Sequence, residues 1–140
     1  MATNNDQEKK LLIKQSAREL FFRFGFSKTS MDDIARQCGL AKPTLYYYFS
    51  NKEAIFNEVV IEEAEGFMDS VEKKLPRNLP ADRRIALFYR TVYRDLKAYA
   101  ANMVDMPPAL YEHSPHGRPI VDKINQMLAG KLRPMLESGK

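Results

Sequence analysis

The sequence has a single cysteine, Cys38, and lacks any apolar run long enough to cross a membrane. One cysteine forms no internal disulfide and holds no metal alone, so neither kind of cross-link is expected. A membrane-spanning helix needs about 20 predominantly apolar residues. The polar start MATNNDQEKK also lacks the apolar core of a secretory signal. These absences indicate a cytoplasmic chain.

Patterns typical of enzymes and metal proteins are equally sparse. No nucleophile–base pair or carboxylate pair stands out, and neither Gly25 nor Gly39 has the spacing of a phosphate-binding loop. His113 and His116 stand beside Glu112 in a proline-rich stretch, which is weak evidence for a metal site. We therefore predict no catalytic residues, no metal and no cofactor.

The charge is moderately basic and unevenly spread. The formal net charge is +4 and the isoelectric point is about 9.2, which permits nucleic acid binding without proving it. Residues 1–53 hold nine basic and six acidic side chains, whereas residues 54–75 hold two and six. The middle segment is therefore a poor candidate for contacting phosphates. Most individual charges are expected only to solvate helix faces.

Apolar residues recur at helical spacing, and strand-like alternation is nearly absent, so the predicted fold class is all-α. Gly25 is the expected left-handed stop of the first helix, Ser50 to Glu53 form an expected capping box, and Pro134 is expected to kink or end the last helix. Helices are expected over about 6–24, 31–38, 41–49, 52–75, 80–103 and 120–136.

The segment 30–49, SMDDIARQCGLAKPTLYYYF, has the features of a helix-turn-helix. Ala35 is small enough for two helices to cross closely, and Gly39 supplies the positive φ of the turn. Ile34, Leu40 and Leu45 have the spacing to lock the pair onto the first helix. The second helix then presents an outward face with polar tips.

This pattern resembles the DNA-binding domain of TetR-family repressors. The resemblance covers about residues 7–67 and includes Phe-Arg-Phe-Gly-Phe at the end of the first helix, Pro43 to Phe49, and Asn51-Lys52-Glu53. It implies a three-helix DNA-binding domain over residues 1–52, joined by a long helix to a helical regulatory domain over residues 53–140.

The resemblance also implies which residues contact double-stranded DNA. The second helix of the motif enters the major groove, where its first residues reach base edges and its tyrosines hold phosphates. Three of these residues have an alternative role. Tyr48 could pack in the core, Ser30 could serve only as a helix cap, and Lys52 could be an ordinary solvated lysine. The implied contacts are Thr29, Ser30, Lys42, Pro43, Thr44, Tyr46, Tyr47, Tyr48 and Lys52.

For the second half, the resemblance implies a small-molecule effector, a homodimer and a palindromic operator. Aromatic and Met residues at helical spacing are candidates for the effector pocket, although such stripes are usually core. They are Phe67, Phe88, Tyr89, Tyr93, Tyr99, Met103, Met106 and Tyr111. The family usually has two further long helices for the dimer interface. The alternative is therefore a truncated relative that acts through protein association, as a heterodimer partner.

Overall fold

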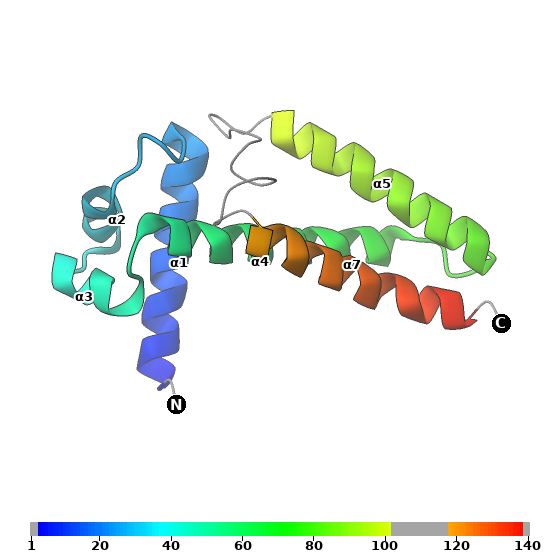
Figure 1. Ribbon diagram of the computed structural model, residues 1–140, viewed down its shortest axis with the longest axis horizontal. Helices are drawn as coiled ribbons and strands as arrows, with labels where there is room; N and C mark the ends of the chain where they lie inside the picture. The colour runs from blue at the N-terminus through cyan, green and yellow to red at the C-terminus, as the bar shows by residue number, and fades with distance from the viewer. Residues whose placement is uncertain (1–2, 102–117, 139–140) are drawn as a thin grey trace. The chain divides into compact units, whose positions relative to one another are not determined.

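The computed structural model describes residues 3–101 and 118–138, and every regular element within them is a helix (Figure 1). The predicted all-α class is confirmed. None of the helices in these residues is long and apolar enough to span a membrane. The elements are α1 (Asn4–Phe24), α2 (Met31–Cys38), α3 (Lys42–Tyr48), α4 (Lys52–Lys74), α5 (Ala81–Ala101) and α7 (Arg118–Ser138).

The described chain divides into two compact units within α4, between Val60 and Ile61. The first unit contains α1 to α3 and the first turns of α4. The second contains the rest of α4 together with α5 and α7. The domain boundary predicted between residues 52 and 53 lies at the start of α4.

Local capping signals set the helix starts. Thr3 and Asp6 cap α1 reciprocally, and Ser30 and Asp33 do the same for α2. At α4 the expected capping box is wrong by one residue, because Asn51 Oδ1 accepts the Ala54 N–H at 2.8 Å. Asn51 is thus the cap, and the residue three positions later is an alanine, which has no carboxylate to return the bond.

Two predicted helix ends differ from the structure. Gly25 has φ 96° and ψ 156°, a glycine-favouring extended conformation rather than the left-handed helical one. Pro134 does not end α7, which continues to Ser138. Met135 directly follows the proline and is 5% exposed in the core, so packing stabilises this last turn despite the missing N–H.

The core of the first unit is formed by the inward faces of four helices. α1 packs against α2, and α2 packs against α3. The rings of Phe21, Phe26 and Phe56 meet with centroids 4.8–5.6 Å apart, which ties α4 to the end of α1. Phe24, the last residue of α1, is exposed instead, with the Arg23 guanidinium over its ring. The main buried side chains are Ile13, Ala17, Phe21, Phe26, Ile34, Ala35, Leu45, Phe49, Ile55, Phe56 and Val59.

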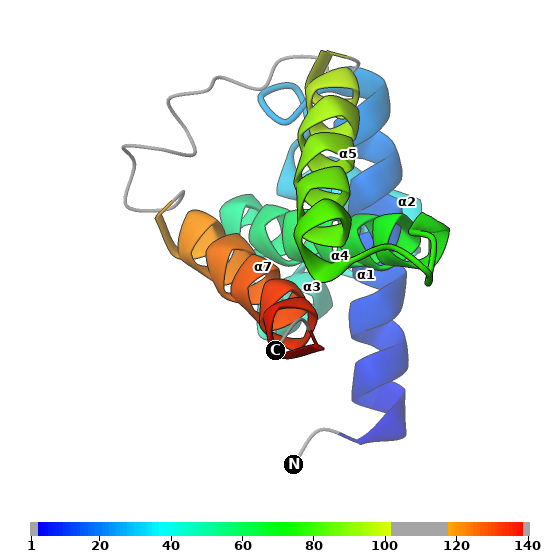
Figure 2. The same cartoon turned by 90° about the vertical axis from the view of Figure 1, so that its right-hand side faces the viewer.

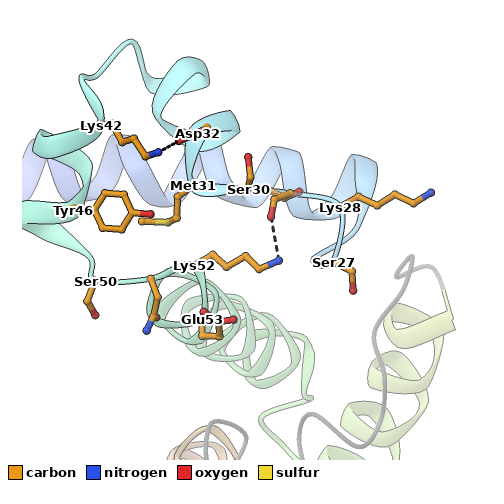
Figure 3. Close-up of a pocket in the computed structure, with 12 residues that line it drawn as sticks. Ser27, Lys28, Ser30, Met31, Asp32, Lys42, Tyr46, Ser50, Lys52 and Glu53 are labelled. Atoms are coloured by element: carbon orange, nitrogen blue, oxygen red, sulfur yellow. Dashed lines mark hydrogen bonds and ion pairs between the residues drawn. The ribbon is translucent and has the colours of Figure 1, made fainter.

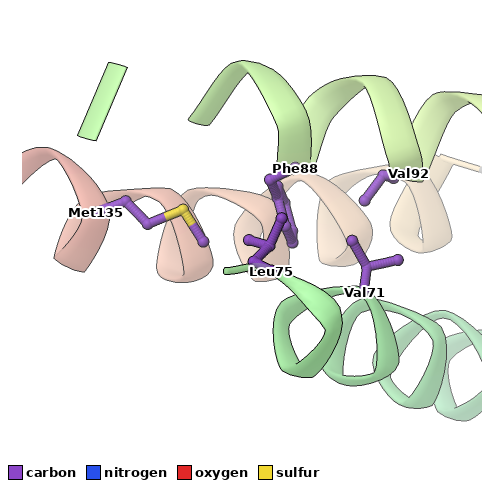
Figure 4. Close-up of a cluster of buried hydrophobic side chains, with 5 residues drawn as sticks. All are labelled: Val71, Leu75, Phe88, Val92 and Met135. Carbon is purple, nitrogen blue, oxygen red and sulfur yellow. The ribbon is translucent and has the colours of Figure 1, made fainter. Parts of the chain in front are cut away.

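The second unit has its own core. α5 packs against α7, and both are continuous helices (Figures 1 and 2). Phe88 is fully buried at the centre of the cluster, between residues of α4 and α7 (Figure 4). On the outside, Lys131 Nζ of α7 contacts Asp69 Oδ1 at 2.5 Å and Glu72 Oε2 at 2.6 Å, both on α4. The cluster consists of Val71, Leu75, Phe88, Val92 and Met135.

Candidate nucleic-acid interface

The turn between α2 and α3 depends on Gly39. Its φ of 70° and ψ of 26° place it in the left-handed helical region, as the sequence predicted. Its N–H bonds the carbonyls of Ala35 and Arg36, and the Leu40 N–H bonds the Ala35 carbonyl at 3.0 Å. These bonds satisfy the last carbonyls of α2 and redirect the chain into α3. Residues 31–48 therefore form the predicted helix-turn-helix.

α3 has a clear division between an inner and an outer side. Leu45 is fully buried and Phe49, just beyond the helix, is nearly so. Pro43 stands in the first turn, where a missing N–H costs little. Positions three or four residues apart lie on the same face of a helix. The exposed residues at that spacing, here called the outer face of α3, are Lys42, Pro43, Tyr46 and Tyr47.

Two tyrosines of the outer face of α3 are exposed. Tyr47 is 77% exposed and Tyr46 is 44% exposed. The Tyr47 ring lies edge-on to Tyr48, with centroids 5.0 Å apart. Thr44 is half-buried at the side of the same helix. The outer face therefore presents one ammonium and two phenol hydroxyls, groups that donate hydrogen bonds to phosphate or base oxygens.

Lys42 has a partner on α2. Its Nζ lies 2.8 Å from Asp32 Oδ1, and both side chains are more than half exposed (Figure 3). The hydrogen bond to Asp32 raises the pKa of Lys42, so the group stays cationic. Exposed ion pairs of this kind contribute little to stability. The ammonium can therefore exchange its carboxylate partner for another anion.

Ser30 combines capping with an exposed hydroxyl. Its Oγ accepts the Asp33 N–H at 3.1 Å, and the Asp33 carboxylate accepts the Ser30 N–H at 3.0 Å. This backbone hydrogen bond is the main reason that the pKa of Asp33 is lowered. Because Ser30 Oγ is an acceptor in the cap, its hydroxyl proton is not used there, and the residue is exposed and lines an open groove. Capping and an outward contact are thus compatible at this residue.

Three residues expected to touch DNA use their polar groups inside the protein. The Thr29 hydroxyl donates to the Gly25 carbonyl at 2.8 Å, and the side chain is only 2% exposed. The Tyr48 hydroxyl donates to Asp6 Oδ1 at 2.8 Å. Their residue types matched the family pattern, but their hydroxyls lie toward α1 and the loop after it. Lys52 is the third.

Lys52, the first residue of α4, faces the loop between α1 and α2. Its Nζ donates to the Phe26 carbonyl at 2.9 Å and to the Thr29 carbonyl at 3.2 Å. The same ammonium lies 4.2 Å from the centroid of the Phe26 ring. A cation that has two carbonyls and an aromatic face already has the partners it needs.

An open groove of about 450 Å³ lies among this loop, α3 and the start of α4. It contains groups that the sequence interpretation did not select, notably Lys28 and Asn51. Lys28 is exposed and extends outward from the loop (Figure 3). The sequence signal that could have identified Lys28 is its position directly before Thr29 and Ser30. The lining residues are Ser27, Lys28, Thr29, Ser30, Met31, Asp32, Lys42, Tyr46, Ser50, Asn51, Lys52 and Glu53.

The residues expected to line an effector pocket are divided in their placement. Phe88 is fully buried in the core of the second unit, and Phe67 packs partly buried against it. Tyr89 and Tyr93 are 53% and 70% exposed, so these two rings face away from that core. Phe67 and Phe88 thus belong to the core, whereas Tyr89 and Tyr93 belong to the surface. The side chain of Tyr99, and Met103, Met106, Tyr111, His113 and His116, lie outside the described residues.

Comparison with known proteins gives one consistent result for the first unit. Residues 13–59 match the family profile described as "Bacterial regulatory proteins, tetR family". The chain is 30% identical over 91 residues to the "Uncharacterized HTH-type transcriptional regulator YhgD" of Bacillus subtilis, covering 65% of this chain and 44% of that one. It is 31% identical over 90 residues to the regulator EthR of Mycolicibacterium smegmatis, covering 61% and 39%. The chain thus spans less than half the length of these relatives.

Solved structures support the fold of both units. A TetR family transcription regulator from Marinobacter aquaeolei VT8 matches with a TM-score of 0.62 at 22% identity, covering 97% of this chain and 70% of that one. Thermus thermophilus FadR, a TetR family repressor solved with lauroyl-CoA, matches with a TM-score of 0.66 at 21% identity, covering 93% and 69%. The likeness extends over the helices of the second unit as well as the helix-turn-helix.

Proposed function

This chain carries the helix-turn-helix domain of the TetR family, and from that premise we propose that it is a sequence-specific DNA-binding regulator of transcription. The observation that carries the proposal is the outer face of α3, where Lys42, Tyr46 and Tyr47 are exposed side by side. This face has the width of a single helix, which the major groove of B-DNA admits.

Base reading is assigned to the first turn of α3. Lys42 donates to guanine O6 and N7, or to a phosphate, after leaving Asp32. Thr44 offers a hydroxyl or, against thymine, a methyl group, and Pro43 places its ring against the groove. Because the Lys42–Asp32 pair is exposed on both sides, its loss on binding costs little.

Backbone contacts are assigned to groups around that turn. The hydroxyls of Tyr46 and Tyr47 donate to phosphates, as do the free hydroxyl proton of Ser30 and the ammonium of Lys28. Such contacts fix the register of a protein on the duplex but carry no sequence information directly. The two classes of contact therefore predict different phenotypes for their variants.

The remaining parts of the proposal rest on the family. Its members work as homodimers on palindromic operators, with the two reading heads about 34–36 Å apart. We extend to this chain a cytoplasmic location, repression, and release by a small-molecule effector bound in the helical second unit. The fold shared with FadR, a repressor solved with lauroyl-CoA, supports an effector without identifying it.

The test is selection of genomic DNA fragments by the purified chain over a salt series. Wild type is expected to enrich particular fragments. Lys42→Ala is expected to reduce the enrichment about fivefold or more, because a good base contact discriminates by about 1–3 kcal/mol. Lys74→Ala is the matched control, since this exposed lysine lies at the far end of α4 in the second unit.

The alternative function is association with a full-length regulator as a heterodimer partner. Failure of wild type to bind any fragment at low salt, where phosphate contacts are strongest, would overturn the proposal and favour this alternative. Binding of all fragments equally, with Lys42→Ala and Lys74→Ala indistinguishable, would leave a DNA-binding chain that does not read sequence through α3.

A further inference from the structure

We propose that Lys52 is a positioning residue, which fixes the loop between α1 and α2 and thereby the helix-turn-helix, and that it does not contact a phosphate. The inference rests on the proposed DNA-binding function, but one part of its test does not. It reverses the role that the family resemblance implied for this lysine, and it follows from the contacts that the ammonium makes.

The ammonium is already satisfied within the protein. Two of its three protons are directed to the carbonyls of Phe26 and Thr29, at 2.9 and 3.2 Å. Its charge also lies 4.2 Å from the Phe26 ring centroid. Reaching a phosphate would require the side chain to leave the loop carbonyls and the ring together. Lys42, by comparison, has to leave only the exposed carboxylate of Asp32 to bind a phosphate or a base.

Lys52 and Phe56 hold the loop as a pair. They are four residues apart on α4 and so share one side of the helix. Lys52 bonds the Phe26 carbonyl, while the Phe56 ring packs on the Phe26 ring at 4.8 Å. Phe21 of α1 contacts both rings, at 5.6 and 5.4 Å. The loop is therefore attached to α4 through backbone and side chain at once.

The attachment continues directly into the reading motif. The Thr29 N–H donates to the Phe26 carbonyl, and the Thr29 hydroxyl donates to the Gly25 carbonyl. The next residue, Ser30, caps α2. A fixed loop thus fixes the start of α2 relative to α4, and α3 packs on α2. Without Lys52 the outer face of α3 keeps the Lys42 ammonium but loses part of its support.

The experiment compares wild type, Lys52→Met, Lys52→Arg and Lys42→Ala on a selected DNA fragment over a salt series. Methionine keeps the packed stem without the charge. A phosphate contact contributes about 0.9 to the salt slope, and arginine serves a phosphate at least as well as lysine. If Lys52 is a positioning residue, both Lys52 variants bind DNA about tenfold more weakly than wild type at every salt concentration. The slope of affinity against salt then stays at the wild-type value. A slope reduced by about 0.9 in Lys52→Met, or wild-type affinity in Lys52→Arg, overturns the proposal.

Amide hydrogen exchange tests the same contact without DNA. In Lys52→Met the Thr29 amide, which donates to the Phe26 carbonyl, is expected to exchange about tenfold faster. The Gly39 amide, held by the carbonyls of Ala35 and Arg36, is the internal control and should not change. Unchanged exchange at Thr29 overturns the proposal even where wild type binds no DNA, so its failure is distinct from failure of the proposed function.

Discussion

The hydroxyl of Tyr48 donates to Asp6 Oδ1 at 2.8 Å, so the last residue of α3 is tied to the first turn of α1. The other carboxylate oxygen of Asp6 accepts the Thr3 N–H, which makes one side chain both a cap and a tertiary contact. The hydrogen bond between Tyr48 and Asp6 is the main reason that the pKa of Asp6 is lowered and that the pKa of Tyr48 is raised.

Replacing Tyr48 by phenylalanine is expected to lower stability near neutral pH and to weaken its pH dependence. Because the pKa of Asp6 is lower in the folded chain than its ordinary 3.8, its contribution is present above that value and lost as pH falls through the folded pKa. Tyr48→Phe removes the main cause of this shift, so the variant loses less stability on acidification. Urea unfolding at neutral pH and below pH 3.8 measures both effects.

Tyr47→Phe is the control for that experiment. Tyr47 is the adjacent tyrosine and is 77% exposed, so its hydroxyl is open to solvent. Its removal should leave the acid dependence of unfolding at the wild-type level. Equal acid dependence in Tyr48→Phe and wild type would show that the Asp6 contact contributes nothing to folding.

The elements of the first unit were predictable because their signals are local. Ser30 and Asp33 cap α2 across three residues, and Gly39 turns the chain by its own φ. Such features depend on bonds within about one helical turn, which a sequence displays directly. The same reasoning missed the cap of α4 by one residue, since Ser50 and Asn51 are both good caps and packing decides between them.

The roles of the polar side chains were less predictable because their partners are distant in sequence. Tyr48 bonds a residue 42 positions away, and Lys52 bonds carbonyls 26 and 23 positions away. The family resemblance, which rests on residue type, implied that both side chains contact phosphates. A hydroxyl or an ammonium bonds whichever acceptor the fold brings near, and only the packed helices determine that acceptor. Exposure of Tyr47, by contrast, follows from its position on the side of α3 opposite Leu45.

Two glycines are expected to respond to alanine with opposite signs. Gly39 has open space where a Cβ would stand but a φ of 70°, so Gly39→Ala should cost about 1–2 kcal/mol from backbone strain alone. Gly66 lies within α4 and also has open space at that position, so Gly66→Ala should stabilise by about 1 kcal/mol through helix propensity. Urea unfolding of both variants checks the signs. Stabilisation by Gly39→Ala would contradict the turn geometry.

Alanine substitutions at Phe88 and Tyr93 are expected to differ strongly in their effect on stability, because one residue lies in the core of the second unit and the other at its surface. Phe88 is fully buried, and Phe88→Ala should destabilise by about 3–5 kcal/mol through lost burial and the cavity left behind. Tyr93 is 70% exposed, and Tyr93→Ala should change stability by about 0.5 kcal/mol or less. Unfolding curves measure both. A small effect at Phe88 would mean that its side chain is not required for packing and would revive its assignment to a pocket.

The ammonium of Lys131 joins α7 to two carboxylates of α4. The Lys131 hydrogen bond is the main reason that the pKa of Asp69 is lowered, and the Asp69 hydrogen bond is the main reason that the pKa of Lys131 is raised. The first contribution is lost as pH falls through the lowered pKa of Asp69. The second is present below the ordinary 10.5 of lysine and lost as pH rises through the raised value. The bridge is therefore strongest between these limits.

Lys131→Met should lower stability at neutral pH, where Asp69 and Glu72 are then two like charges three residues apart on one helix face. This loss of stability should become smaller in acid, because protonation of the carboxylates removes their repulsion. Added salt should reduce the loss less than acid does, because salt screens the repulsion only in part. Lys123→Met is the matched control, since this lysine of α7 is exposed. Thermal unfolding across pH measures the difference. If the two variants lose equal stability at every pH, the carboxylates of α4 do not hold α7 through Lys131, and apolar packing around Phe88 alone accounts for that contact.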